Sequence, residues 1–291
     1  MAVKNKQKIA KSSLTKRSLQ KFCKNPLAII GLIGLIVIVT MCICAPLLTD
    51  YDPNYLDMSM RSLPMSKEHP LGTDRQGRDM WARVLYGGRW SLLLGFGASI
   101  CVNTLAAILG CVAGFVGGKV DRALVTLQEF LSLFPTTLVF ILVSGLMGAN
   151  IWFVLLVWIV TGWGGTMRIV RSKIMSLKQE PFIESCRANG ISNASIMFHH
   201  MVPNTLGPII LNVTMNVGGY ILAEAGLTYL GIGIPASVAT WGNILNGAKR
   251  LDILMTQPVL WLAPGIAILL VTLCINFFGD GLRDAMDSTT R

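Results

Sequence analysis

The stretch FLSLFPTTLVFILVSGLMGANIWFVLLVWIVTGWGGTM, residues 130–167, contains no charged residue and decides the class of fold. As one helix, its 38 residues would reach roughly 57 Å, whereas the hydrocarbon core of a membrane is roughly 30 Å thick. Turn-forming residues occupy Gly145–Asn150, near the middle. We therefore predict a helical hairpin that crosses a membrane twice, near residues 124–146 and 151–170.

The overall composition also indicates a membrane protein. Of 291 residues, 53% are hydrophobic and 14% are charged, whereas soluble domains have about 25% charged residues. The formal net charge of +10 in so apolar a chain points to a membrane surface and its lipid rather than to nucleic acid. These figures exclude a soluble protein and indicate no nucleic-acid partner.

Four further runs are long and apolar enough to cross a membrane. They lie at residues 25–48, 90–118, 206–230 and 258–278. The first lacks a small-x-small cleavage site, so it is not a cleavable signal peptide. Gly110, Gly114 and Gly118 recur every four residues, which predicts a face that a neighbouring helix approaches closely. The fold class is therefore an all-α polytopic membrane protein with six transmembrane helices.

The distribution of lysine and arginine predicts the orientation. With an inner amino terminus, 17 of these residues lie in inner segments and 8 in outer segments. Because basic residues accumulate on the cytoplasmic side, both termini are predicted to be cytoplasmic. Residues 1–24 form a basic cytoplasmic tail, residues 49–89 an extracellular loop, and residues 90–287 the core with spans two to six. The inner segment at 171–205 and the outer loop are too long to be plain connections.

The sequence contains no complete motif for binding ATP or a metal ion. GFVGGKV at Gly114–Val120 lacks the first glycine and the final Ser/Thr of a phosphate loop, so we expect no ATP site here. None of the seven cysteines lies in an outer segment, and no cysteine or histidine spacing predicts a metal site. In the outer loop, Asp74 and Asp79 with Arg75 and Arg78 are interpreted as turn formers and a salt-linked fold.

The inner segment is the most informative part of the chain. From Glu180 it reads EPFIESCRANGISNASIMFHHMVPN, which is two amphipathic stretches around Asn189-Gly190. Asn-Gly is a turn or helix-stop signal. We predict a helix, a sharp turn with Gly190 at positive φ, and a second short helix along the cytoplasmic membrane face. Such a projection suits docking by a soluble partner, although periodicity alone leaves a surface helix without a partner open.

The same segment resembles the EAA signature of inner-membrane permease subunits of ATP-binding-cassette importers. The likeness is to the second, C-type permease of the dipeptide, oligopeptide and nickel systems. In this signature Ser185 and Cys186 replace two alanines, Asn189 replaces a usual leucine, and the matching residues are Glu184, Ala188, Gly190, Pro203 and Asn204. Further blocks resemble the family in the same order: HPLGTDRQGRD (69–79), LGIGIPASVATWGN (230–243) and GDGLRDAMD (279–287). The region from Gly233 to Trp241 is poorer in proline than is usual for the family.

The resemblance implies a type I ABC-importer permease fold in the plasma membrane of a bacterium or archaeon. It implies a homologous second permease, two ATP-binding subunits and an extracellular substrate-binding lipoprotein. No cofactor would be bound by this chain, because ATP and Mg would lie on the partner subunits. The chain would not be an enzyme. Its segment at 171–205 would be the coupling loop, with Glu184, Ser185, Cys186, Ala188, Gly190, Pro203 and Asn204 at the ATPase contact.

Glu224 is an acidic residue predicted well inside a span. An ionisable residue in a membrane suggests a functional site. Two roles stay open: a hydrogen-bonded strut within the bundle, or a group that faces the substrate pathway.

Three alternatives to a peptide importer are weighed. The same architecture importing nickel or a metal chelate is the nearest, because the binding protein selects the substrate in such systems. A secondary transporter driven by an ion gradient would need broken helices and acids at mid-membrane, for which Glu224 alone is thin support. A membrane enzyme would need a converging nucleophile, base and metal ligands, which the sequence does not offer.

Overall fold

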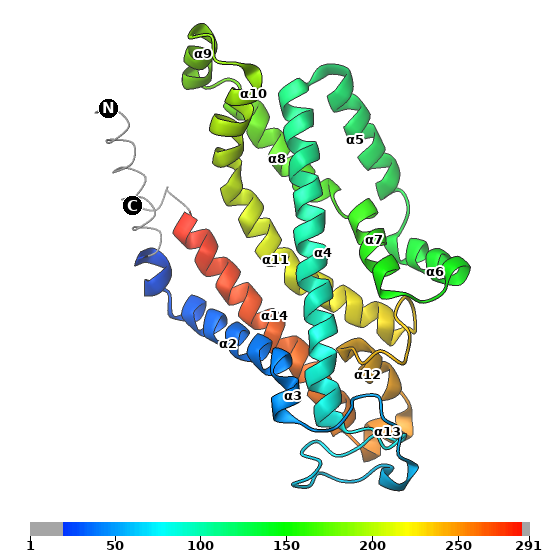
Figure 1. Ribbon diagram of the computed structural model, residues 1–291. Helices are drawn as coiled ribbons and strands as arrows, with labels where there is room; N and C mark the ends of the chain where they lie inside the picture. Colours follow the sequence, from blue (N-terminus) through cyan, green and yellow to red (C-terminus); the bar gives the residue numbers. More distant parts are fainter. Residues whose placement is uncertain (1–19, 287–291) are drawn as a thin grey trace.

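The computed structural model describes residues 20–286, which form an elongated bundle of helices (Figure 1). Five helical segments are long and apolar enough to cross a membrane. They are α2 (Pro26–Ile43), α4 (Met80–Val116), α7 with α8 (Ile151–Leu177), the helix from Asn193 to Tyr229, and α14 (Val259–Met286). A bent pair, α5 (Gly118–Ser132) and α6 (Thr136–Met147), makes a sixth crossing if the two helices count as one span. The predicted all-α membrane fold is confirmed, with five spans or, counting the bent pair, the predicted six. Of the predicted basic tail, residues 1–19 lie outside the described residues.

Helix α4 forms the axis of the bundle. It packs against α8 (Gly164–Leu177), α11 (Val202–Tyr229) and α2, while α2 runs antiparallel along α14 (Figure 1). The Asp79 side chain caps α4 by accepting a hydrogen bond from the Ala82 N–H at 2.6 Å. Helix α4 contacts most of the other spans.

The predicted glycine face is confirmed at two of its three positions. A Cβ atom on Gly110 would lie 2.7 Å from the Met167 carbonyl oxygen, and one on Gly114 would lie 2.8 Å from the Arg171 carbonyl oxygen. These glycines therefore let the backbones of α4 and α8 approach closely. Gly118 differs, since it has φ +57° in the turn into α5 and nothing within 4 Å of a Cβ position.

The third predicted span is not one straight helix. The prediction of residues 124–146 is corrected to α5 and α6, which meet at a bend of 75°. The break falls at Leu133–Pro135, because proline lacks an N–H and disfavours helical backbone in the preceding residue. The first span is likewise interrupted, with α3 (Ala45–Leu48) following α2 at Cys44, before Pro46.

Helix α4, which contains the second predicted span, begins at Met80, within the predicted outer loop of residues 49–89. Arg83 and Arg89, which the charge pattern assigned to the loop, are helical. Their guanidinium groups donate to carbonyl oxygens: Arg83 Nη1 to Pro53 at 3.0 Å and Arg89 Nε to Cys42 at 2.7 Å. These charged side chains interrupt the apolar run, but their hydrogen bonds to carbonyl oxygens allow the helix to include them.

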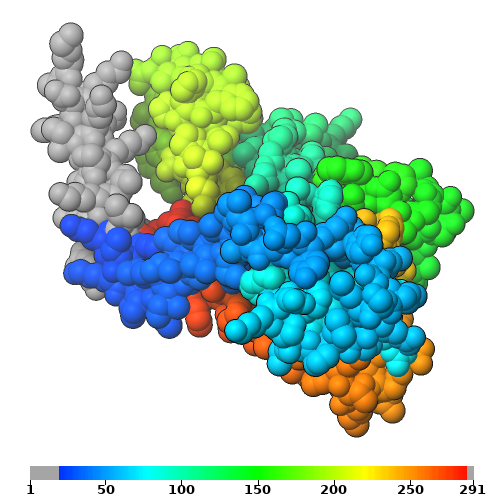
Figure 2. Space-filling view, turned by 60° about the horizontal axis from the view of Figure 1, so that its bottom comes forward, coloured from blue at the N-terminus to red at the C-terminus, as the bar shows by residue number. Residues whose placement is uncertain are grey.

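The two ends of the bundle differ in construction. One end carries α9 (Pro181–Ala188) and α10 (Asn193–Ser195), and the opposite end carries residues 49–79 with α12 (Trp241–Gly247) and α13 (Leu251–Thr256) (Figure 1). Figure 2 shows residues 49–79, including η1 (Met58–Met60), spread over that second end beside α12 and α13. The expected salt-linked fold is confirmed in part, because Arg78 Nη2 lies 2.7 Å from Asp74 Oδ2. Asp79 instead contacts His69, whose Nδ1 lies 2.8 Å from Oδ2, and Arg75 pairs with Asp252 of α13.

Candidate functional site

Helix α9 projects from the end of the bundle and is held there by the buried side chain of Ile183. Glu180 is the N-cap residue and Pro181 occupies the first turn, where a missing N–H costs nothing. Ile183 is fully buried in a cluster with Ile174 of α8 and with Ile196 and Met201 of the following helix. Residues Glu184, Ser185 and Ala188 remain exposed. The apolar cluster thus fixes a short helix whose other face is open to a partner.

Gly190 ends α9 as the sequence predicts. It has φ +72°, a conformation that residues with a side chain rarely adopt. Its N–H donates to the Arg187 carbonyl oxygen at 2.9 Å, and the Ile191 N–H donates to the Cys186 carbonyl oxygen at 3.1 Å. Nothing lies within 4 Å of a Cβ position on Gly190, so backbone conformation rather than space demands glycine here.

The seven predicted coupling residues fall into two places. Glu184, Ser185, Cys186, Ala188 and Gly190 lie on α9 or its terminal turn, and Pro203 with Asn204 lies on the first turn of α11. The second short helix is therefore corrected. Instead of ending at Pro203, it begins at Asn193 and runs through the π-helical turn η2 (Ile196–Met201) into α11. Pro203 follows directly after the π-helical turn, where the regular hydrogen-bond ladder of the helix is already interrupted.

The open face of the projection is partly apolar, which the sequence analysis missed. Phe182 is 41% exposed and Phe198 is 61% exposed. Contiguous exposed apolar surface rimmed by polar residues is typical of an interaction surface. The available signal was the presence of two phenylalanines in a segment outside the predicted spans. The Glu184 carboxylate has no hydrogen bond or ion pair within residues 20–286, so it is free for a partner.

The projection is joined firmly to the bundle. Lys178 Nζ, just after α8, donates to the Phe115 carbonyl oxygen of α4 at 2.8 Å. Arg171 of α8 pairs with Asp121 of α5 through two nitrogens, with Nη2 2.6 Å from Oδ2. The Lys178 bond and the close contact at Gly110 and Gly114 hold α8 against α4, and the Arg171–Asp121 pair holds α8 against α5.

A groove runs along α11 on the side that faces α7 (Ile151–Thr161), α8 and α6. Two adjoining cavities of about 410 and 500 Å³ share Trp158, Gly162, Tyr220 and Ala223 in their walls. The rings of Trp158 and Tyr220 lie 5.2 Å apart between centroids. Among the described residues that line these cavities, none is charged. The groove therefore offers aromatic and neutral polar groups.

Behind the groove, a buried amide joins three helices. Thr166 Oγ1 of α8 donates to Asn103 Oδ1 of α4 at 2.6 Å, and Asn216 Nδ2 of α11 donates to the same oxygen at 3.3 Å. Sequence reasoning missed this polar face. Its signal was the four-residue spacing of Asn212, Asn216 and Tyr220 in a predicted span, which places the three on one side of a helix.

Glu224 lies outside this groove. Its side chain is fully buried between α4, α11 and α12. Ser91 Oγ donates to Glu224 Oε2 at 2.8 Å, and Thr228 Oγ1 donates to Oε1 at 3.1 Å. The Trp241 N–H in turn donates to Ser91 Oγ at 3.2 Å. This geometry favours the strut over the pathway role, of the two that the sequence left open.

Comparisons with known proteins agree with this architecture. Residues 106–291 match the family model described as binding-protein-dependent transport system inner membrane component. Residues 13–64 match the model of the N-terminal TM domain of oligopeptide transport permease C. The chain is 38% identical over 264 residues to the dipeptide transport system permease protein DppC of Alkalihalophilus pseudofirmus, with 91% of this chain and 86% of the relative covered.

Two oligopeptide relatives cover still more of the chain. The oligopeptide transport system permease protein OppC of Escherichia coli is 35% identical over 282 residues, with 96% of this chain and 92% of the relative covered. The protein of that name from Bacillus subtilis is 33% identical over 287 residues, with coverages of 98% and 93%. The chain therefore belongs to the family of inner-membrane components of binding-protein-dependent transport systems.

Proposed function

We propose that the chain is a transmembrane permease subunit of an ATP-driven peptide importer and forms half of its translocation pathway. The observation that carries this proposal is the groove along α11, which is long, uncharged and lined by aromatic and amide side chains. The relatives named above are dipeptide and oligopeptide permeases, which supports peptides as the cargo. The location is a bacterial plasma membrane.

An uncharged groove suits peptides of many sequences. Amide side chains such as Asn212 and Asn216 can donate to and accept from a peptide backbone, while Trp158 and Tyr220 offer apolar ring faces. A nickel ion would need imidazole, thiolate or carboxylate ligands, and the described lining residues include none of these. The metal alternative is therefore not favoured.

The groove is open to one side, so a second, homologous permease would close it into a pathway. Energy would come from ATP and Mg on two separate ATP-binding subunits, and an extracellular substrate-binding lipoprotein would deliver the peptide. Helix α9 suits docking in a groove of an ATP-binding subunit, because it presents Glu184 beside exposed Phe182. Membership of the family and the open surfaces of the chain support these partners.

Coupling would be mechanical. When the ATP-binding subunits close, they would move α9, and α8 together with α4 would carry this displacement to the groove. Asn103 and Thr166, which join α4 to α8 behind the groove, lie on that route. The pathway would then alternate between access from the α9 side and access from the α13 side.

The predicted orientation places the α9 end in the cytoplasm, together with both termini. Its test is labelling with an impermeant thiol reagent in intact cells. Cysteines at Lys67 and Lys249 should react from outside, whereas a cysteine at Lys173 should react only after the membrane is opened. Labelling of the Lys173 site in intact cells would reverse the orientation.

The function itself is tested by uptake of a labelled tripeptide into proteoliposomes that contain the assembled transporter. Uptake should require ATP on the α9 side and the binding protein on the other side. Replacement of Glu184 by Arg should prevent co-purification with the ATP-binding subunits while the permease stays folded. Uptake driven by an ion gradient without ATP would instead identify a secondary transporter.

A further inference from the structure

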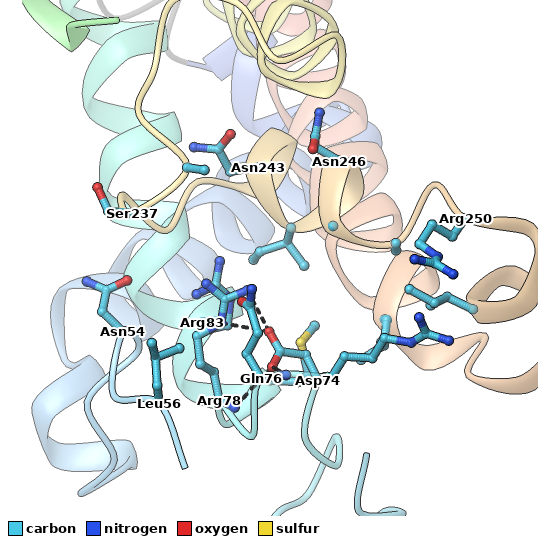
Figure 3. Close-up of a pocket in the computed structure, with 18 residues that line it drawn as sticks. Asn54, Leu56, Asp74, Gln76, Arg78, Arg83, Ser237, Asn243, Asn246 and Arg250 are labelled. Carbon is cyan, nitrogen blue, oxygen red and sulfur yellow. Dashed lines mark hydrogen bonds and ion pairs between the residues drawn. The ribbon is translucent and has the colours of Figure 1, made fainter. Parts of the chain in front are cut away.

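A separate cavity lies at the end of the bundle that carries α12 and α13, and it plays no part in the pathway described above. It has a volume of about 550 Å³ and lies between the outer segment and the segment after α11. Figure 3 shows Asn54 and Arg78 on one side and Asn243, Asn246 and Arg250 on the other. Ligand pockets in proteins commonly measure about 300 to 1,000 Å³, so the cavity is of a size to hold a small molecule. We call it the arginine cavity.

The walls of the arginine cavity carry four guanidinium groups, those of Arg75, Arg78, Arg83 and Arg250, and one carboxylate, that of Asp74. Three of the arginines have acidic partners. Arg78 pairs with Asp74, while Arg75 and Arg250 share Asp252, which lies outside the wall. Four positive charges against two negative charges leave an excess of two positive charges around the space.

Arg83 is the unbalanced member. It is only 1% exposed, and it forms no ion pair within residues 20–286. Its single hydrogen bond runs from Nη1 to the Pro53 carbonyl oxygen at 3.0 Å, which uses one of five N–H donors. A buried guanidinium is stable when an anion accepts from it, and a planar carboxylate matches its fork.

The rest of the lining favours a carboxylate that belongs to a peptide. Met80, Ile244 and Leu260 give the cavity apolar walls. The side-chain N–H groups of Asn243 and Asn246 donate to backbone carbonyl oxygens of the chain, which leaves their Oδ1 atoms as acceptors. The cavity thus combines donors for a carboxylate with acceptors for backbone N–H groups.

We infer that the arginine cavity is a binding site for the terminal carboxylate of a short peptide, with Arg83 as its main anchor. The carboxylate site rests on the geometry of the cavity alone, and only the identity of the ligand as a peptide rests on the proposed function. A peptide held here would lie at the entrance on the α13 side, separate from the groove along α11.

The test is a binding measurement on the assembled transporter in lipid nanodiscs, without ATP and without the binding protein. The probes are trialanine, trialanine amide and inorganic phosphate, each titrated by calorimetry. Trialanine should bind, and its amide should bind more weakly by about tenfold or more. Phosphate should compete poorly with trialanine. Equal binding of the acid and the amide, or full competition by phosphate, would overturn the assignment.

Variants locate the site. Arg83→Gln should weaken trialanine binding about tenfold or more. The affinity of Arg83→Lys should lie between those of the wild type and Arg83→Gln, because lysine keeps the positive charge but lacks the two parallel N–H donors of a guanidinium group. Arg250→Gln, on an exposed wall residue, should weaken binding less and tests the site even if Arg83 variants fold poorly. The matched control is Arg61→Gln, in the same outer segment but outside the cavity. Unchanged binding in both cavity variants would contradict the proposal, whether or not peptide import is observed.

Discussion

Asn216 and Glu224 stand on the same helix, two steps of four residues apart, yet they face opposite surroundings. Asn216 lines the open groove, whereas Glu224 is sealed between α4 and α12. Each four-residue step turns an α-helix by about 40° beyond one full turn, so the polar stripe has rotated by about 80° between them. A polar residue in a span thus lines an open groove or makes a buried contact according to the neighbour that its face meets.

Substitutions at the buried Glu224 should reduce stability more than substitutions in the groove. Glu224→Ala removes the acceptor of Ser91 Oγ and opens a cavity, so the free energy of unfolding should fall by about 3 kcal/mol. Glu224→Gln keeps the size and one oxygen acceptor and should cost about 1 kcal/mol. Thermal unfolding of the assembled transporter, followed by size-exclusion fluorescence, measures both. An alanine variant that unfolds like the wild type but loses transport would instead give Glu224 the pathway role.

Substitution at the close contact between α4 and α8 should cause the next largest loss of stability. A Cβ on Gly114 would lie 2.8 Å from the Arg171 carbonyl oxygen, so Gly114→Ala should force the helices apart and lower the free energy of unfolding by about 2 kcal/mol. Gly97, also on α4, has nothing within 4 Å of a Cβ position. Gly97→Ala should therefore be neutral or slightly stabilising in the same unfolding assay. Equal effects of the two would remove the basis for α4 and α8 moving together.

The sequence predicted the class of fold because charge-free runs and their lengths are one-dimensional features. It predicted the Gly190 turn because only backbone conformation matters there. It misplaced the beginning of α4, since whether Arg83 ends a helix depends on a carbonyl oxygen 30 residues earlier in the chain. It also overlooked Asn216, whose groove is formed by residues from α7 and α8 that no local pattern brings together.

Gly190→Val should affect function more than stability. The positive φ at this position should cost about 1 kcal/mol locally when a side chain is added. The permease should insert normally and lose ATP-dependent tripeptide uptake. Gly118→Val provides a control, because Gly118 also has a positive φ, of 57°, and nothing within 4 Å of a Cβ position, but lies at the beginning of α5. Uptake at the wild-type rate in Gly190→Val would contradict a coupling role for this turn.

Substitutions in the open groove along α11 should have the smallest effect on stability. Asn216→Ala removes only a long hydrogen bond to Asn103, at 3.3 Å, so the free energy of unfolding should change by about 0.5 kcal/mol or less. The concentration of tripeptide for half-maximal uptake should nevertheless rise. Leu222→Ala, on an exposed face of the same helix outside the groove, should leave uptake unchanged. Equal uptake in both variants would remove Asn216 from the pathway.

The central claim, that movement of α9 controls access to the groove, has a direct test in the accessibility of Ala223. This residue lines both groove cavities, and Ala223→Cys adds one small reactive group. The background should first be lowered by replacing the exposed Cys23 and Cys101 with serine.

In the assembled transporter in nanodiscs, the rate of maleimide modification at this cysteine should differ several-fold between the ADP-bound state and a state with a non-hydrolysable ATP analogue. Adding Gly190→Val should abolish the difference. Identical rates in the two nucleotide states, without Gly190→Val, would contradict the account.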